Sequence, residues 1–332
     1  MAQHEAVTEE IFVGADLSGQ YIRVGAVDAG GQILTFRREP YTATGEDASG
    51  GRLLADQLIA AVQGMVNEQF AAPIGAIGVG FPGLVNRTLQ HIIKLPPAPG
   101  LANLDLHQEF QRAFRLHTTF ENNANAAAFA EMTRGVAQNV KDWLYLGISD
   151  SIGAGLVLDG KLRRGKSGFA GEIGHMNIDP DGIECLCGSF GCLETMASAP
   201  NIVRRTRARL QRDSTSSLSR LGAQRNFTYD DIISAAHSGD DLARMMMQRT
   251  GHFIGMAVAD VINLLNLSMV VIGGPSAARP FLVPAITEEA HRRALGAAFT
   301  DCQIIAGELG EEAGVIGAAL LARDAAGNMK TR

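Results

Sequence analysis

Short apolar strand segments and helical segments alternate along this chain, and the same order occurs twice. Residues 11–39 predict strands joined by glycine turns, residues 50–70 have the apolar spacing of a helix, and residues 74–85 predict a buried strand that ends in a Gly/Pro loop. A second round begins near Asn125 with a helix, followed by the strand segments WLYLGIS, GAGLVLDG and SMVVIGG. The pattern therefore predicts an α/β protein whose two halves repeat one theme.

The length and composition predict two lobes. The 332 residues, 46% of them hydrophobic, can bury a large core, and no linker or low-complexity tract separates the halves. We therefore expect closely joined lobes with a cleft between them. The expected small N-terminal lobe is residues 1–121 and the large lobe is residues 122–313, and a C-terminal helix at about 314–328 is expected to pack back on the small lobe.

Charge and hydropathy exclude some classes of function. The 35 acidic and 29 basic residues give a net charge of −6, which argues against a general nucleic-acid-binding surface. The N-terminal sequence MAQHEAVTEEIF lacks the features of a targeting signal, and no apolar run approaches the ~18 residues of a membrane span. We therefore expect a cytoplasmic protein without a membrane partner.

Three of the four cysteines lie close together behind a histidine. Cys185, Cys187 and Cys192 fall within one short glycine-containing loop, and His175 precedes them. In a reducing cytoplasm a disulfide would not persist, whereas three thiolates and one imidazole are a common ligand set for structural Zn²⁺. The sequence predicts a zinc site, and the alternative is a set of buried thiols beside a core histidine.

The run FAGEIGHMNIDPDGIECLCGSFGCLET, residues 169–195, resembles the signature of the ROK family of repressors and sugar kinases. The segments GVGFPGLV and ENNANAAAFAE before this run, and VVIGG and AGVIGAALLA after it, occur in the order that the family shows. The resemblance implies a two-lobed, actin-like (ribonuclease-H-like) fold, with two mixed sheets flanked by helices and a cleft between the lobes. It also implies a hexose or hexosamine ligand, a structural zinc ion and, in the kinases, ATP with Mg²⁺.

The resemblance assigns residues to these ligands. Sugar-binding groups would be Gly83, Asn122, Glu172, His175 and Glu194. Nucleotide-binding groups would be Asp16, Gly19, Gly153, Gly273 and Gly274. Carboxylates and amides suit a polyol because they accept or donate at several hydroxyls, and His175 would bind zinc through one ring nitrogen and sugar through the other. The alternative is that the acids cap helices or pair with arginines.

The catalytic motifs depart from those of the family's kinases. Asn123 stands where the kinases carry the aspartate that takes the proton from the sugar hydroxyl, and an amide cannot act as a base. A general base typically contributes ~10²–10⁴ in rate. The first phosphate loop carries Ser18 and Gln20 in place of a glycine and a threonine, and the second carries Asp150 ahead of its glycines. Such loops disfavour a triphosphate, unless Asp150 points away from it.

These departures favour a sugar sensor or regulator with weak or no kinase activity, and the alternative is an ATP-dependent hexose or hexosamine kinase. A metal-stabilised scaffold without a ligand is a third possibility. The family's repressors carry an N-terminal helix-turn-helix domain, and with the first strand beginning by Ile11 we expect no direct DNA-binding domain here. The resemblance implies pairing through the large lobe, and the helix of residues 251–267 offers more apolar faces than one core contact requires. We therefore expect a homodimer or a higher even-numbered oligomer, with burial of this helix inside its own lobe as the alternative.

Overall fold

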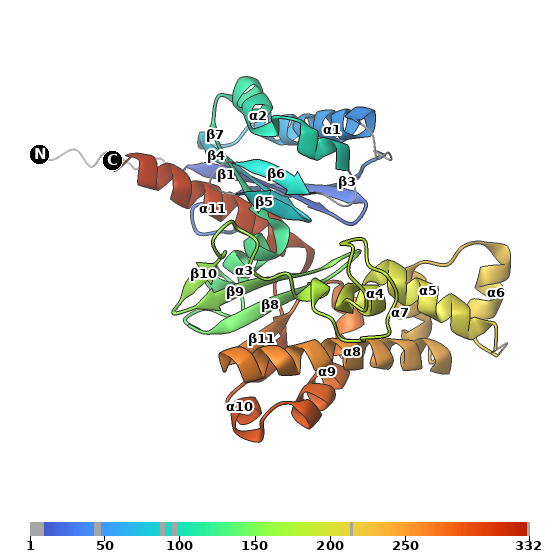
Figure 1. The fold of residues 1–332 in the computed structure, drawn as a ribbon. Coiled ribbons are helices and arrows are strands. Elements are labelled where there is room, and N and C mark those ends of the chain that lie inside the picture. Colours follow the sequence, from blue (N-terminus) through green and yellow to red (C-terminus); the bar gives the residue numbers. More distant parts are fainter. Residues whose placement is uncertain (1–9, 43–47, 87–89, 95–98, 213–214, 331–332) are drawn as a thin grey trace, which may run out of the picture. The chain divides into compact units, whose positions relative to one another are not determined.

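The computed structural model describes residues 10–42, 48–86, 90–94, 99–212 and 215–330. Residues 1–9, on which the expectation about a targeting signal depends, lie outside the described residues. The chain divides into two units (Figure 1). The first comprises Met1–Gln138, Arg164–Ala170 and Glu312–Arg332, and the second comprises Asn139–Arg163 and Gly171–Glu311.

A five-stranded mixed sheet forms the centre of the first unit. Strand β1 pairs antiparallel with β2 and parallel with β4, and Asp16 lies opposite Arg23 in the β1–β2 ladder. Strand β7 ends the sheet, so its outer edge has no strand partner within the part of the chain that the structure describes. In sheet order the strands are β3 (Ile33–Pro40), β2 (Tyr21–Val27), β1 (Ile11–Ser18), β4 (Ile74–Phe81) and β7 (His117–Asn122).

Helices cover both faces of this sheet (Figure 1). Helices α1 and α2 cover one face, with Leu17, Leu58 and Phe120 among the buried side chains, and α11 covers the other beside α3. The α11 backbone lies so close to β4 that a Cβ atom on Gly78 would be 1.8 Å from the Ala318 carbonyl oxygen. The helices are α1 (Ala48–Val66), α2 (Leu106–Phe114), α3 (Asn123–Thr133) and α11 (Ala313–Lys330), with a β5 (Leu84–Asn86) and β6 (His91–Lys94) hairpin and the short η1 (Pro99–Asn103).

The second unit repeats the strand order of the first. Its first three strands along the chain pair antiparallel, and the last two add parallel at the β8 edge. The predicted α/β class with two mixed sheets is therefore confirmed, and the repeat seen in the sequence has the same topology in both units. In sheet order the strands are β10 (Lys161–Arg163), β9 (Ile152–Leu158), β8 (Trp143–Ile148), β11 (Met269–Ile272) and β12 (Gln303–Ala306).

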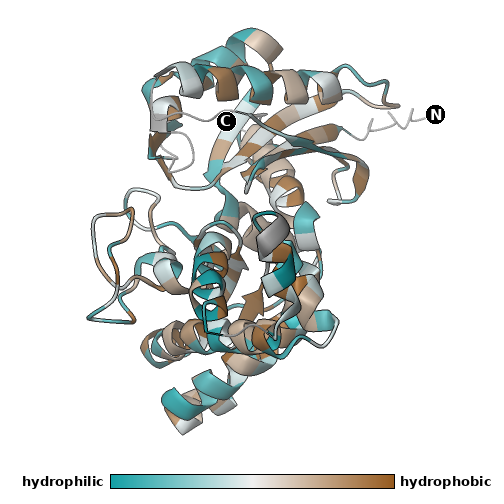
Figure 2. Ribbon diagram, turned by 90° about the vertical axis from the view of Figure 1, so that its right-hand side faces the viewer, coloured by the Kyte–Doolittle hydropathy of each residue, from teal (hydrophilic) through white to brown (hydrophobic). Residues whose placement is uncertain are grey.

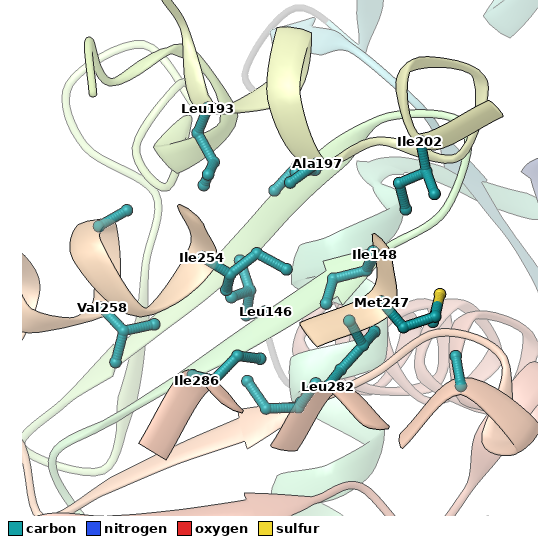
Figure 3. Close-up of a cluster of buried hydrophobic side chains, with 14 of the residues drawn as sticks. Leu146, Ile148, Leu193, Ala197, Ile202, Met247, Ile254, Val258, Leu282 and Ile286 are labelled. Carbon is teal, nitrogen blue, oxygen red and sulfur yellow. The ribbon is translucent and has the colours of Figure 1, made fainter. Parts of the chain in front are cut away.

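Helices of the second unit bury one large apolar cluster against its sheet. Figure 3 shows Leu146 and Ile148 of β8 among side chains from α8 and α9, such as Ile254 and Ile286. Figure 2, which is coloured by hydropathy, shows mainly hydrophobic residues in the strands and both hydrophobic and hydrophilic residues in the helices. The helical segments are η2 (Ile173–His175), α4 (Leu193–Ala197), α5 (Ala199–Leu210), α6 (Ser217–Gln224), α7 (Tyr229–His237), α8 (Asp241–Leu265), η3 (Ser276–Ala278), α9 (Arg279–Arg293), α10 (Gly296–Thr300) and η4 (Gly310–Glu312), whose last residue belongs to the first unit.

Helix α8 contains most of residues 251–267, the apolar segment that predicts self-association. It begins after Asp240, whose side chain accepts a hydrogen bond from the Ala243 N–H, and it ends at Asn266 in the left-handed conformation. Most of its apolar residues are buried within the unit, whereas Leu264 is 80% exposed. Among the described helices, none combines the length and apolarity that a membrane span requires.

Candidate functional site

The four predicted metal ligands converge in the second unit. The ligand atoms of His175, Cys185, Cys187 and Cys192 all lie within 4.8 Å of one another. His175 Nδ1 is 3.7 Å from Cys185 Sγ, and Cys187 Sγ is 3.7 Å from Cys192 Sγ. Sulfur ligands at ~2.3 Å from a tetrahedral Zn²⁺ lie about 3.8 Å from each other. The spacing of the donor atoms therefore fits a tetrahedral ion of that size.

Backbone turns hold this cluster in place. The Cys185 N–H donates to the Ser189 carbonyl and the Gly188 N–H donates back to the Cys185 carbonyl, which closes the loop around Cys187. Gly191 has a φ of 63°, and a Cβ atom there would lie 1.7 Å from the Asp179 carbonyl oxygen, so only glycine fits. The glycines of the loop thus allow a short segment to turn its sulfur atoms inward.

The thiols of this cluster are strongly disfavoured as free anions. Burial, together with the neighbouring Cys187 and Cys185, raises the pKa of the Cys192 thiol to about 12, and burial also raises the pKa of Cys185. Cys302 lies alone in the second unit, where burial raises its pKa to about 11. A bound cation would reverse this preference at the cluster, because it stabilises thiolates directly.

Two carboxyl groups lie beside the cluster of His175 and the three cysteines. Glu172 Oε2 is 3.9 Å from His175 Nε2, the ring nitrogen that does not face Cys185. Glu194 Oε2 accepts a hydrogen bond from the Ile152 N–H at 3.0 Å. Burial raises the pKa of both carboxyls, His175 partly offsets this, and the charge of Glu194 further raises the pKa of Glu172. The two acids and the imidazole thus form a partly desolvated set of hydrogen-bonding groups next to the cysteines.

In the first unit, the structure brings Asn122 and Gly83 together. Asn122 Nδ2 donates to the Gly83 carbonyl at 3.0 Å, and its Oδ1 caps α3 by accepting from the N–H groups of Ala124 and Asn125. Gly83 has a φ of 141°, which favours glycine. The Asn122 side chain therefore has a structural role as a helix cap, and one amide hydrogen remains for a ligand.

Asp16 and Asn123 lie on either side of Gly80. An ideal Cβ atom on Gly80 would be 3.3 Å from Asp16 Oδ1 and 3.4 Å from Asn123 Cβ. Asn123 Nδ2 also lies 3.5 Å from the Leu17 carbonyl, which it can donate to and an aspartate could not. Asp16 is 5% exposed, and its Oδ1 has no hydrogen-bond partner among the described residues. Burial, partly offset by Arg23, raises the pKa of Asp16 to about 6.

Arg23 is a member of this group that the sequence analysis missed. Its guanidinium is 4.0 Å from Asp16 Oδ2, and Nη1 donates to the Ser18 carbonyl at 2.9 Å. A signal was present in the sequence, because Arg23 interrupts an otherwise apolar strand next to a turn, and hairpin pairing puts it opposite Asp16. Gly19 forms that turn with a φ of 61°, followed by Gln20.

The remaining predicted nucleotide-binding residues lie in the second unit. Gly153 is in β9, directly opposite Gly147 of β8. Gly273 and Gly274 follow β11, and a Cβ atom on Gly274 would lie 2.2 Å from the Ile148 carbonyl oxygen. In the turn that joins β8 to β9, the Ser149 N–H donates to the Ser151 carbonyl, and Asp150 is exposed. These glycines thus gather at one end of the β8–β11 pair.

Comparisons with known proteins agree with this architecture. A family model described as ROK family matches residues 12–325. The chain is 28% identical to a glucokinase from Halalkalibacterium halodurans, over 98% of both chains, and 27% identical to a xylose repressor from Bacillus subtilis, over 92% of this chain and 75% of the repressor. A solved ROK family glucokinase from Streptomyces griseus, in complex with glucose and AMPPNP, is similar with a TM-score of 0.83 and 29% identity, covering 95% of this chain and 99% of that one.

Proposed function

Because the chain belongs to the ROK family, we propose that it is a sugar-binding sensor or regulator with weak or no kinase activity. The observation that carries this proposal is the set formed by Glu172, His175 and Glu194, which offers acceptors and a donor from partly buried positions. Such groups bind a polyol selectively, because a ligand that lacks a hydroxyl leaves one of them unpaired. Similarity to both glucokinases and xylose repressors supports a sugar as the ligand class.

We propose a hexose or hexosamine as the ligand. Its proposed binding groups in the second unit are Glu172, His175 and Glu194. In the first unit, the Asn122 amide beside Gly83 is a separate candidate for a sugar hydroxyl. A structural Zn²⁺ bound by His175 and the three cysteines would hold the imidazole in the orientation that the sugar requires. Thiolate ligands also favour a reducing compartment, so we propose the cytoplasm as the site of action.

The nucleotide half of a kinase site fits this chain poorly. Asp16 is the carboxylate that would lie nearest a magnesium ion, and the Arg23 guanidinium already provides a fixed cation 4.0 Å from it. A divalent ion at Asp16 would be repelled by that charge. The Asn123 amide nitrogen donates toward the Leu17 carbonyl, and its side chain has no basic atom that could take the proton from a sugar hydroxyl. These contacts support a sugar-binding protein rather than an efficient kinase.

One observation favours the alternative, an ATP-dependent hexose or hexosamine kinase. The buried Asp16 keeps one carboxylate oxygen without a partner among the described residues, and an orphaned oxygen of this kind is suited to a cation. The glucokinases among the relatives point the same way. Phosphoryl transfer depends largely on positioning and electrostatics, so the loss of a base at Asn123 does not by itself abolish it.

Calorimetric titration with a panel of hexoses and hexosamines, and separately with Mg-ATP, distinguishes the two functions. We expect heat from at least one sugar and none from Mg-ATP. Glu172→Gln should weaken sugar binding by ~10-fold or more, because it removes a charged acceptor, whereas Glu184→Gln at an exposed position of the same loop should not. Robust sugar-dependent ADP production by the unaltered chain would select the kinase, and absence of heat from every sugar would reject both.

We also propose a homodimer in which α8 takes part. The exposed Leu264 near the end of this helix is the apolar group that a second copy would cover. Light scattering at micromolar concentration should give twice the mass of one chain. A particle with the mass of a single chain would contradict this proposal.

A further inference from the structure

A cavity of about 640 Å³ lies in the first unit, away from the residues considered so far. It runs beside β7, the strand whose outer edge has no partner strand among the described residues. Its volume is within the range of sites for small organic molecules. Segments far apart in the sequence line it, including His107, Gln111, His117, Arg164, Lys166 and Met329.

The lining of this cavity carries positive charge and no negative charge. Arg164 and Lys166 are cationic, and His107 and His117 add two imidazoles, whereas no aspartate or glutamate belongs to the lining. Lys166 is exposed and makes no ion pair with any residue that the structure describes. An anion that entered the cavity would therefore meet an uncompensated ammonium group.

Arg164 is held in a fixed orientation. Its Nε donates to Glu121 Oε2 at 2.6 Å, and the Glu121 side chain is only 5% exposed. The other carboxylate oxygen of Glu121 accepts from the Asn122 N–H and from Asn125 Nδ2, both at 3.1 Å. The two terminal nitrogens of Arg164 make no hydrogen bond with a described residue. A preoriented guanidinium with free terminal donors is well suited to the oxygens of a phosphate.

His117 provides a second group that lacks a partner. Its Nε2 is buried and has no hydrogen-bond partner among the described residues. Burial, with a contribution from His107, lowers the pKa of His117. A buried ring nitrogen without a partner is costly, and a ligand oxygen in the cavity would satisfy it.

The cavity is separate from the proposed sugar-binding residue of this unit. His117 begins β7 and Asn122 ends it. At ~3.3 Å per residue their Cα atoms are about 16 Å apart, and neither Asn122 nor Gly83 lines the cavity. A ligand in the cavity therefore does not use the Asn122 amide.

We propose that this cavity binds a small phosphorylated metabolite, such as a sugar phosphate. Lys166 and Arg164 hold the phosphate, His117 provides a further hydrogen bond, and the organic part lies against the apolar surface of Met329. The site is additional to the proposed sugar site and does not depend on it.

Calorimetric titration of the full chain with a hexose 6-phosphate, with inorganic phosphate and with the unphosphorylated hexose tests this proposal. The hexose 6-phosphate should bind, and saturation with free hexose should leave its affinity unchanged, because the two sites are separate. Lys166→Ala should weaken this binding by about tenfold or more, because it removes a charge-assisted contact. Lys161→Ala, at an exposed lysine of β10 that does not line the cavity, should leave it unchanged.

The outcomes separate the possible occupants. Inorganic phosphate that binds as tightly as the sugar phosphate, with the same dependence on Lys166, would still support an anion site, with free phosphate as its ligand. The proposal would be overturned by the absence of heat from both phosphates, by equal losses in the two lysine variants, or by competition from free hexose.

Discussion

Asp16→Asn should stabilise the first unit at neutral pH and have little effect in acid. The carboxyl is 5% exposed, and its burial raises the pKa from 3.8 to about 6. Each pKa unit corresponds to about 1.4 kcal/mol, so this difference corresponds to about 3 kcal/mol. The carboxyl is neutral in both states only well below pH 3.8, the cost of ionising it in the folded state builds up between pH 3.8 and about 6, and it is fully present above that range. Removing the carboxyl should therefore raise the free energy of unfolding by up to about 3 kcal/mol at pH 7.5.

The pH-dependent part of this effect is the quantity to measure. At pH 4.5 the carboxyl is already neutral in the folded state, so the substitution removes no anionic partner of Arg23 there. At pH 7.5 it does, and this loss is already included in the pKa of about 6, which the Arg23 charge lowers. The only tryptophan, Trp143, lies in the second unit, so hydrogen exchange of peptides from β1 and β4 is a better probe than fluorescence. Asp324→Asn, at a half-exposed position of α11, is the matched control.

The result that refutes this reasoning is a change in stability that is equal at both pH values. Added Mg²⁺ gives a second measurement on the same variants. Magnesium that stabilises the unaltered chain at pH 7.5, but not the Asp16→Asn variant, would show that the carboxylate binds the ion in spite of Arg23. That result would favour the kinase over the sensor.

Three other changes test separate parts of the structure. Cys187→Ser should reduce bound zinc from one ion per chain to well below one and also weaken sugar binding, whereas Cys302→Ala should retain the metal; elemental analysis measures both, and protein purified without chelators that holds no zinc would reject the site. Asn123→Asp should not restore sugar-dependent ADP production, because the other changes in the phosphate loops remain; a rise of ~10²-fold in a coupled assay would contradict this. Gly78→Ala should destabilise the first unit by about 1–3 kcal/mol through a clash with α11, with Gly327→Ala as the control at an open position, and equal unfolding midpoints would disprove the close approach.

Much of the fold could be predicted from local patterns. Strand and helix segments follow from apolar spacing and glycine turns, and their repetition along the chain corresponds to two sheets of the same order. The assignment of Arg164–Ala170 to the first unit could not be predicted in this way. The chain between β10 and Gly171 contributes there through the contact of Arg164 with Glu121, 43 residues earlier in the sequence. No local periodicity records such a contact.

The candidate sites also differ in how far the sequence predicts them, according to whether their residues are close together or far apart in the sequence. The convergence of His175 with the three cysteines was predictable because these residues lie close together in the sequence and their types are characteristic of a zinc site. The contact of Arg23 with Asp16 requires the register of the β1–β2 hairpin, which the sequence suggests but does not specify. The cavity beside β7 could not be predicted from the sequence, because Gln111, Lys166 and Met329, which line it, come from three distant segments.

His175 links the proposed metal ion to the proposed sugar, and each of its two ring nitrogens would serve one of these ligands. Nδ1 faces Cys185 at 3.7 Å and Nε2 faces Glu172 at 3.9 Å. A metal ion on Nδ1 uses its lone pair, so the proton of a neutral imidazole must be on Nε2. Nε2 is then a donor only, and it can serve Glu172 or a sugar oxygen but cannot accept from a hydroxyl. Loss of the proposed metal ion would free both the other tautomer and the ring orientation, so the affinity for the proposed sugar should fall when zinc is removed, although the ion need not contact the sugar.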